Sequence, residues 1–428
     1  MRKFYPLLLL QVLVIIGLLV ALELGRWPFP THLLRWDAVW YDTIRDHGYA
    51  FSATRHNNTA FFPFFPLVWR TTHLGPIGIS LLNLLLAGTS LYLLWRRLGL
   101  RADVVVLFAA FPSSLFLYLP YTEALFFFFS TIVVLTLARR EAQPLGLAAG
   151  LLGGALTRVA AFFYLPALAV LESVEWLATP GTFWQRARRL LGYGLLTGAG
   201  LAAVVLYQWW QTGVWFAFNK SQALWDHHFG GLRLPFISTT DNDGALWLDG
   251  LAVTVGLLAL AWVAWVVVGT ARGRRPAPEG LLLFSAAYLA ATMLQTVLNA
   301  PVEYGHSSLL SLHRYVFCTP FFLVVLDRVV PRQALAWRPA ALGLAAVLLT
   351  AAMVGAFGPK QFDIEWPTSK IPFLWGPVAG VTYAVFMLTY GFLWLQAGTR
   401  WGRALVYVSS LALQLFFCYT YAVGHWVG

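Results

Sequence analysis

The chain has 428 residues, of which 59% are hydrophobic and only 11% are charged, and its formal net charge is +11. A soluble domain carries about 25% charged residues, so this composition excludes a disordered chain and an ordinary soluble enzyme. The basic residues stand singly or in short groups between apolar runs. We therefore interpret the positive charge as membrane topology and not as nucleic-acid binding. The two cysteines, Cys318 and Cys418, lie in apolar runs and indicate no disulfide framework.

Apolar runs long enough to cross a bilayer recur along the whole chain. They lie near residues 5–25, 76–95, 103–119, 122–138, 145–171, 192–212, 247–269, 280–298, 315–330, 339–357, 376–396 and 404–422. The run over 145–171 is long for one span, and Arg158 interrupts its middle, so we predict two short helices that meet near Arg158. The fold class is then an all-α polytopic membrane protein with about 13 transmembrane helices.

The distribution of charge predicts the sidedness of these spans. Most Arg and Lys residues fall on one side, which the positive-inside rule assigns to the cytoplasm, while all nine His and most acidic residues fall on the other. The N-terminus is then cytoplasmic and the C-terminus lies outside. Residues 1–428 form a single integral-membrane domain, in which the helices of 331–428 are expected to be accessory. The site must be built from the longer outer loops, which cover about 26–75, 213–246, 299–314 and 358–375.

The first outer loop contains the most promising carboxylate. Thr31 can cap a short interfacial helix over about 32–47, on which Asp37 and Tyr41 lie one turn apart and share a face. Trp36 and Trp40 flank Asp37, so its surroundings are apolar. A catalytic role for Asp37 competes with a plainer one, in which it pairs with Arg35 or caps a helix.

Glu123 and Arg158 are charged residues inside apolar segments. Each is costly near membrane depth unless it has a partner or reaches a water-filled cavity. Glu123 begins a helix after Pro120, where the helix dipole also favours its charge. Arg158 could bind a lipid phosphate in a bidentate way, or it could form an internal ion pair with Glu123.

The remaining outer loops carry histidines, aromatic residues and a DxD sequence. His313, Arg314 and Tyr315 begin an apolar run, where they could grip a phosphate or simply anchor the helix at the interface. Asp241 and Asp243 form the DxD, but the chain has no soluble domain of the kind that uses this pattern with nucleotide sugars. We therefore predict no metal site and no cofactor.

Several of these segments together resemble the PIG-V mannosyltransferase family, within the membrane-embedded GT-C glycosyltransferases. They are RWDAVWYDTIRDHGY at 35–49, AFFPFFPLVWR at 60–70, LYLPYTEALFFFFS at 117–130, LTRVAAFFYLP at 156–166, the pattern of Phe218, Gln222 and Trp225, and HRYVF at 313–317. The sequence is similar to bacterial-type members, and the resemblance extends to about residue 330. Ala161 departs from the Gly that related sequences carry there, which concerns packing and not chemistry.

The resemblance implies an inverting transferase that moves mannose from a polyprenyl-phosphate donor to an acceptor hydroxyl, as in glycolipid biosynthesis. It implies that Asp37 is the general base and that Arg158 and Arg314 hold the donor phosphate. The sugar and acceptor are expected to contact Glu123, Tyr41, Gln222, Trp225, His228, His313 and Tyr315. Expected partners are the lipid-linked donor, a glycolipid or glycan acceptor, membrane lipids and an accessory membrane subunit.

The cellular setting follows from the same reasoning. The protein is expected in the cytoplasmic membrane of a bacterium, or in the endoplasmic reticulum of a eukaryote, with its active site on the outer or luminal side. Two alternatives stay open: a GT-C transferase for another sugar, such as arabinose or glucose, and a flippase or transporter of a lipid-linked sugar. A transporter is typically built from inverted repeats, and the sequence has one interrupted span and no second copy.

Overall fold

The computed structural model describes residues 5–24, 32–139, 144–225, 230, 232–234, 236, 246–273, 279–303, 306–309, 311–332, 361–366, 369–375 and 388–427. The α-helices are α1 (Tyr5–Leu24), α2 (Asp37–His47), α3 (Phe64–Thr72), α4 (Pro76–Leu98), α5 (Ala102–Ala109), α6 (Glu123–Ala138), α7 (Pro144–Thr157), α8 (Tyr164–Ala178), α9 (Phe183–Thr212), α10 (Ala217–Leu224), α11 (Leu246–Ala271), α12 (Gly280–Leu298), α13 (Leu312–Phe317), α14 (Pro320–Val329) and α17 (Arg400–Val423). Short 3-10 helices are η1 (Asn58–Ala60), η2 (Pro112–Leu117), η3 (Val159–Phe163) and η5 (Gln396–Gly398). The chain also has two antiparallel strand pairs, β1 (Val302–Glu303) with β2 (His306–Ser307) and β3 (Gln361–Trp366) with β4 (Ser369–Trp375).

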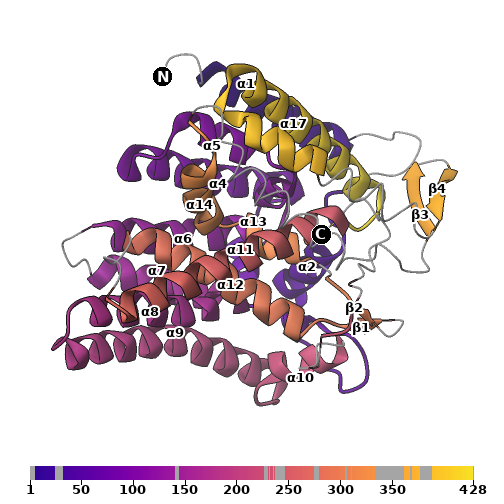
Figure 1. Cartoon of the computed structure of the whole chain (residues 1–428). Helices are drawn as coiled ribbons and strands as arrows, with labels where there is room; N and C mark the ends of the chain where they lie inside the picture. The colour runs from indigo at the N-terminus through magenta and orange to yellow at the C-terminus, as the bar shows by residue number, and fades with distance from the viewer. Residues whose placement is uncertain are drawn as a thin grey trace.

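Six of the described helical segments are long and apolar enough to cross a membrane. They are Pro76–Leu98, Val159–Ala178, Phe183–Thr212, Trp247–Ala271, Gly280–Leu298 and Arg400–Val423. Figure 1 shows α1 and α17 together along one edge of the bundle and α9 along the opposite edge. This is the architecture of a multi-pass integral membrane protein. The predicted span near 339–357 and most of the one near 376–396 lie outside the described residues. The total of 13 spans and the sidedness of the termini stay predictions.

The predicted pair of short helices around Arg158 is confirmed. Helix α7 ends at Thr157, Arg158 adopts an extended backbone, and η3 leads into α8. Arg158 therefore lies at the break between the two helices, and its side chain, which is 10% exposed, reaches Glu123 from there.

Two predicted spans, 103–119 and 315–330, are not continuous helices. The first is divided into α5 and η2 by Ala110 and Phe111, before Pro112. The second is divided into α13 and α14 before Pro320. A proline has no N–H to continue a helix and clashes with the preceding turn, which accounts for both breaks.

Side-chain amides from neighbouring helices satisfy the carbonyl groups that these breaks leave free. Gln414 of α17 donates from Nε2 to the carbonyl oxygens of Ala109 and Phe111, both at 3.0 Å. In the same way, Asn83 of α4 donates from Nδ2 to the carbonyls of Leu119 and Tyr121, at 2.5 and 3.0 Å. Irregular backbone at membrane depth is tolerated where other protein groups satisfy it.

The predicted helix over 32–47 begins later than expected. Helix α2 starts at Asp37, and the residue before it, Trp36, has a positive φ of 52°. The expected cap, Thr31, lies outside the described residues. Asp37 is thus the first residue of the helix, and its carboxylate lies at the helix N-terminus.

Small residues let α9 approach α7 closely. A Cβ placed on Gly200 would lie 2.6 Å from the Cβ of Ala155, whereas a Cβ on Gly198 of the same helix would meet nothing within 4 Å. Close helix contacts of this kind are typical of membrane bundles. There, small residues let the backbones approach, and van der Waals packing takes the place of the hydrophobic effect.

Gly200→Leu should therefore destabilise the protein, and Gly198→Leu should not. Overpacking costs about 1–3 kcal/mol of unfolding free energy, which should lower the thermal unfolding midpoint in detergent by several degrees. The midpoint can be measured by the loss of the monodisperse peak in size-exclusion chromatography after heating. Equal midpoints for the two variants would contradict this packing of α7 on α9.

Candidate active site

Four charged side chains from distant parts of the sequence form one continuous chain of ion pairs. Arg314 binds Asp37 through Nη2 and Oδ2 at 2.7 Å, and it binds Glu123 through Nε and Oε1 at 2.7 Å. Arg158 reaches the same Glu123 oxygen from Nη1 at 2.5 Å. The order is thus Asp37, Arg314, Glu123, Arg158, with two formal negative and two formal positive charges.

The local fold explains how each of these side chains arrives at the cluster. The two carboxylates are the first residues of α2 and α6, where the helix dipole stabilises negative charge. Of the two arginines, Arg158 comes from the break after α7 and Arg314 from the short helix α13.

Backbone strain also concentrates beside the cluster. Trp36, immediately before Asp37, has φ 52°, and Ser311, three residues before Arg314, has φ 68°. A non-glycine residue in this region costs about 1–3 kcal/mol and persists only where the surrounding structure holds it in place. Such strain is characteristic of functional sites, and here it fixes the starting points of the two helices that carry Asp37 and Arg314.

The four side chains differ in exposure, and therefore in which of them a substrate can reach. The side chains of Glu123 and Arg314 are 1% and 4% exposed, whereas that of Asp37 is 20% exposed. Among the described residues, the Nη1 group of Arg314 has no hydrogen-bond acceptor although it is buried. A buried guanidinium donor without an acceptor is costly, so this nitrogen can take an oxygen of a bound anion.

Burial and the neighbouring charges act in opposite directions on Arg314. Burial lowers the pKa of its guanidinium, but the carboxylates of Glu123 and Asp37 outweigh that effect and raise the pKa well above its ordinary value. Arg314 therefore stays a cation at any physiological pH.

Aromatic rings surround the two guanidinium groups. The guanidinium carbon of Arg314 lies 5.1 Å from the ring centre of Tyr121, 5.2 Å from Phe116 and 5.5 Å from Trp426. The ring of Tyr315 lies 5.0 Å from Arg158 and 5.5 Å from Arg314. Cation–π contacts to side chains as buried as these favour the charged form and hold both cations in place.

His313 forms its hydrogen bonds with residues outside the ion-pair chain. It is fully buried, its Nε2–H donates to the carbonyl of Val427 at 3.1 Å, and its Nδ1 accepts from the Ser113 hydroxyl at 2.8 Å. Burial and the charge of Arg314 lower the pKa of His313 to about 3, so the ring is neutral. The predicted contact of His313 with sugar or acceptor stays a prediction, and in this structure the ring joins α13 to η2 and to the chain end.

The other predicted residues lie at varying distances from the cluster. The Tyr41 hydroxyl is 3.2 Å from the Thr122 hydroxyl, beside Glu123, and burial followed by the charge of Asp37 raises the pKa of this phenol. Trp225 packs on Trp40, one turn after Asp37, with ring centres 5.9 Å apart. Gln222 of α10 is half-buried, and its backbone carbonyl accepts from the N–H of Trp225, outside the cluster. His228 lies outside the described residues.

The last turn of α17 and the residues after it form a part of the site that the sequence did not indicate. Trp426 packs edge-on against Trp36 at 5.4 Å, and the Tyr421 hydroxyl donates to the carbonyls of Leu33 and Arg35, both at 3.0 Å. Figure 1 shows the chain end beside α2. No charged residue or motif in the sequence distinguishes these residues. Aromatic residues at this position are equally typical of the aromatic belt at a membrane interface.

No cluster of three His, Cys, Asp or Glu side chains that could hold a metal ion occurs among the residues that the structure describes. Asp241 and Asp243 lie outside these residues, so the DxD sequence has no structural account. At the ion-pair chain, both carboxylates are already bound to arginine. The arrangement is suited to binding an anion, not a cation.

Comparison with known proteins gives a distant structural likeness. No family model and no curated protein sequence matches the chain. Among solved structures, the chain is similar to the crystal structure of ArnT from Cupriavidus metallidurans bound to undecaprenyl phosphate, with a TM-score of 0.46 and 14% sequence identity over 98% of this chain and 76% of that one. At this distance the likeness assigns neither family nor activity, so the functional argument is based on the side chains described above.

The neutral state of His313 predicts how stability depends on pH. Because its folded pKa of about 3 is below the ordinary value of 6.5, the unfolded chain binds a proton in this interval and the folded protein does not. Stability should therefore fall as pH is lowered from about 6.5 towards 3. His313→Gln should make this fall less steep, while a change at the exposed His47, His47→Gln, should leave it as in the wild type.

The measurement is the thermal unfolding midpoint in detergent at a series of pH values for the three proteins. Identical pH slopes for wild type and His313→Gln would show that His313 is not held neutral by its buried position.

Proposed function

We propose that the protein is an inverting glycosyltransferase of the GT-C type, which moves a sugar, specifically mannose, from a polyprenyl-phosphate donor to an acceptor hydroxyl at the outer membrane face. The observation that carries this proposal is the pairing of two buried guanidinium groups with an adjacent, accessible carboxylate. The guanidinium groups are suited to binding a lipid-linked phosphate, and the carboxylate is suited to activating a hydroxyl.

Arg158 and Arg314 are the proposed phosphate-binding groups. Arg314 has a buried Nη1 donor without an acceptor in the described structure, and the aromatic rings around it exclude water. A planar guanidinium group can bind two oxygens of one phosphate through two parallel hydrogen bonds. A phosphate between them would be stabilised most when the glycosidic bond breaks, because the leaving polyprenyl phosphate then gains a negative charge.

Exposure favours Asp37 over Glu123 as the general base. Glu123 is 1% exposed and holds both arginines, so an incoming hydroxyl has no path to it that leaves the cluster intact. Asp37 uses only Oδ2 for Arg314, and its Oδ1 has no partner among the described residues. We assign Glu123 to the orientation of the arginines and Asp37 to the proton transfer.

The proposed reaction is one displacement. Oδ1 of Asp37 accepts the proton of the acceptor hydroxyl, whose oxygen forms a bond to the anomeric carbon from the face opposite the phosphate. The bond between the anomeric carbon and the phosphate oxygen breaks, and its electron pair stays on the polyprenyl phosphate. Because attack and departure occur on opposite faces, a β-linked donor gives an α-linked product.

An aromatic wall beside Asp37 supports a sugar-containing acceptor. Trp40 stacks on Phe61 with ring centres 6.1 Å apart, and Trp225 lies edge-on to both. His56 stacks on the Trp225 ring at 4.3 Å. Flat rings of this kind pack against the C–H face of a sugar. We therefore place the acceptor along Trp40 and Trp225, with Tyr41, Gln222, His228 and Tyr315 as candidate contacts for the two substrates.

Asp37→Asn should abolish sugar transfer while the protein still folds. The amide keeps the shape of the side chain but cannot take a proton, and general-base catalysis contributes about 10²–10⁴-fold in rate. Asp42→Asn is the matched control, because Asp42 lies on the same helix and pairs with Arg45 outside the cluster at 2.8 Å. The assay measures mannose transfer from polyprenyl-phosphate mannose to a membrane-lipid extract by the purified protein in lipid.

Three results would contradict parts of this proposal. Equal transfer by wild type and Asp37→Asn would remove Asp37 as the base. Transfer from a polyprenyl-phosphate arabinose or glucose, but not from the mannose donor, would correct the sugar. Donor flipping in liposomes without transfer would favour a transporter.

Transfer should not require a divalent metal, because the arginines supply the positive charge at the phosphate. EDTA at millimolar concentration should leave the initial rate of mannose transfer within about twofold of the untreated rate. A strict requirement that added Mg²⁺ or Mn²⁺ restores would contradict this prediction and would direct attention to Asp241 and Asp243.

A further inference from the structure

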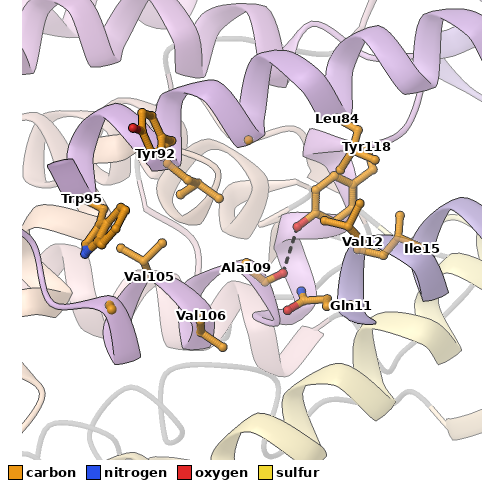
Figure 2. Close-up of a pocket in the computed structure, with 13 residues that line it drawn as sticks. Gln11, Val12, Ile15, Leu84, Tyr92, Trp95, Val105, Val106, Ala109 and Tyr118 are labelled. Atoms are coloured by element: carbon orange, nitrogen blue, oxygen red, sulfur yellow. Dashed lines mark hydrogen bonds between the residues drawn. The ribbon is translucent and has the colours of Figure 1, made fainter. Parts of the chain in front are cut away.

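An apolar cavity lies between α1, α4 and α5, away from the ion-pair chain. It has a volume of about 120 Å³ and is lined by residues that include Val12, Ile15, Leu84, Leu91 and Val105 (Figure 2). Engineered apolar cavities of about 150 Å³ stay dry and bind small hydrocarbons, so this space suits a segment of hydrocarbon chain. Its rim includes Tyr92, which is 56% exposed, so the cavity opens on the surface of the bundle.

Gln11 places an unpaired polar group in the wall of this cavity. The residue is 1% exposed, its Oε1 accepts from the Tyr407 hydroxyl at 3.5 Å, and its Nε2 has no acceptor within the described chain. The Tyr118 hydroxyl, which Figure 2 shows beside Gln11, already donates to the carbonyl of Ala109. A buried amide donor without an acceptor is costly, so the occupant of the cavity should carry an oxygen that accepts from Nε2.

Two exposed arginines end the helix α4 directly after the part of it that lines the cavity. Arg96 and Arg97 follow Trp95, which lines the cavity, and both are exposed at the end of α4. The guanidinium of Arg96 lies 5.3 Å from the Trp95 ring. The carboxylate at this end, Asp103, is bound to Arg101 and approached by Arg403, which leaves Arg96 and Arg97 to an anion.

The depth of Gln11 fits an occupant with three parts in a fixed order. Arg403 of α17 approaches Asp103, which lies at the same α4–α5 end as Arg96, at 3.8 Å. Tyr407, which reaches Gln11, lies one turn further along α17, about 6 Å deeper at 1.5 Å per residue. A basic surface, and below it an amide donor in the wall of an apolar cavity, match a phosphate, an ester carbonyl and an acyl chain.

We propose that this cavity is a binding site for one anionic glycerophospholipid. Its phosphate contacts Arg96 and Arg97, an ester carbonyl accepts from Gln11 Nε2, and an acyl chain fills the space between α1, α4 and α5. Basic pockets between membrane helices bind lipid headgroups in this way. A polyprenyl chain is a poorer occupant, because it has no oxygen that could accept from Gln11.

The site is also distinct from the proposed donor-phosphate site. Asn83 of α4 contacts the backbone at Tyr121, whose ring faces Arg314. Arg96 lies 13 positions further along the same helix, which corresponds to about 20 Å. The lipid site and the transfer reaction therefore make separate predictions.

Gly88 offers a direct way to close the cavity. It lines the space, and a Cβ placed there meets nothing within 4 Å, so a leucine side chain can enter without moving its neighbours. Gly198→Leu is the matched control, since Gly198 is also unobstructed and lies on the membrane-crossing α9. The probes are phosphatidylglycerol and phosphatidylcholine, titrated into the delipidated, detergent-purified full chain and followed by native mass spectrometry.

Wild type and Gly198→Leu should retain one phosphatidylglycerol in preference to phosphatidylcholine. Gly88→Leu should weaken this binding at least tenfold, and Gln11→Leu should weaken it while eluting as a folded protein. The double variant Arg96→Gln with Arg97→Gln should lose the preference for the anionic lipid. Equal retention by Gly88→Leu, no headgroup preference in the wild type, or displacement of the lipid by undecaprenyl phosphate at a one-to-one ratio would overturn the proposal.

Discussion

One carboxylate oxygen, Oε1 of Glu123, holds the site together, because both Arg158 and Arg314 bind it. At 1% exposure Glu123 could not be accommodated as an unpaired charge, and without it Arg158 would lose its carboxylate partner and Arg314 one of its two. Breaking a buried pair of this kind costs about 3–5 kcal/mol. Glu123 thus connects α6 to α13 and to the break that follows α7. Arg314 extends the connection to α2 through Asp37. The breaks in the helices are what allow these four side chains to meet.

The irregular backbone around the site depends on the rest of the bundle. Asn83 and Gln414 satisfy the carbonyls of the segments before α6 and η2, and His313 links α13 to η2 and to the chain end. These groups do not react in the proposed mechanism. They hold the helix N-termini and the two arginines in the geometry that the reaction requires, which is how binding sites are kept rigid at membrane depth.

The sequence predicted much of this because membrane helices leave strong patterns. Long apolar runs and the interruption at Arg158 located α4, α9, α11, α12, α17 and the α7–α8 break, and the cost of charge in an apolar segment pointed to Glu123 and Arg158. The sequence also offered the pairing of these two residues as an alternative. It could not show that Arg314 joins them to Asp37, because this contact spans 277 positions. It also missed the prolines that divide two spans and the role of Trp426, whose contacts exist only in the folded chain.

The central claim is that Arg158 and Arg314 form a lipid-phosphate site beside Asp37. The most direct measurement is a structure of the protein with polyprenyl phosphate bound, determined in a lipid nanodisc. The account predicts a phosphate oxygen within hydrogen-bonding distance of both guanidinium groups, with the Arg314 Nη1 donor engaged and Asp37 facing the same space. A phosphate bound elsewhere, with both arginines still paired only to Glu123 and Asp37, would contradict it.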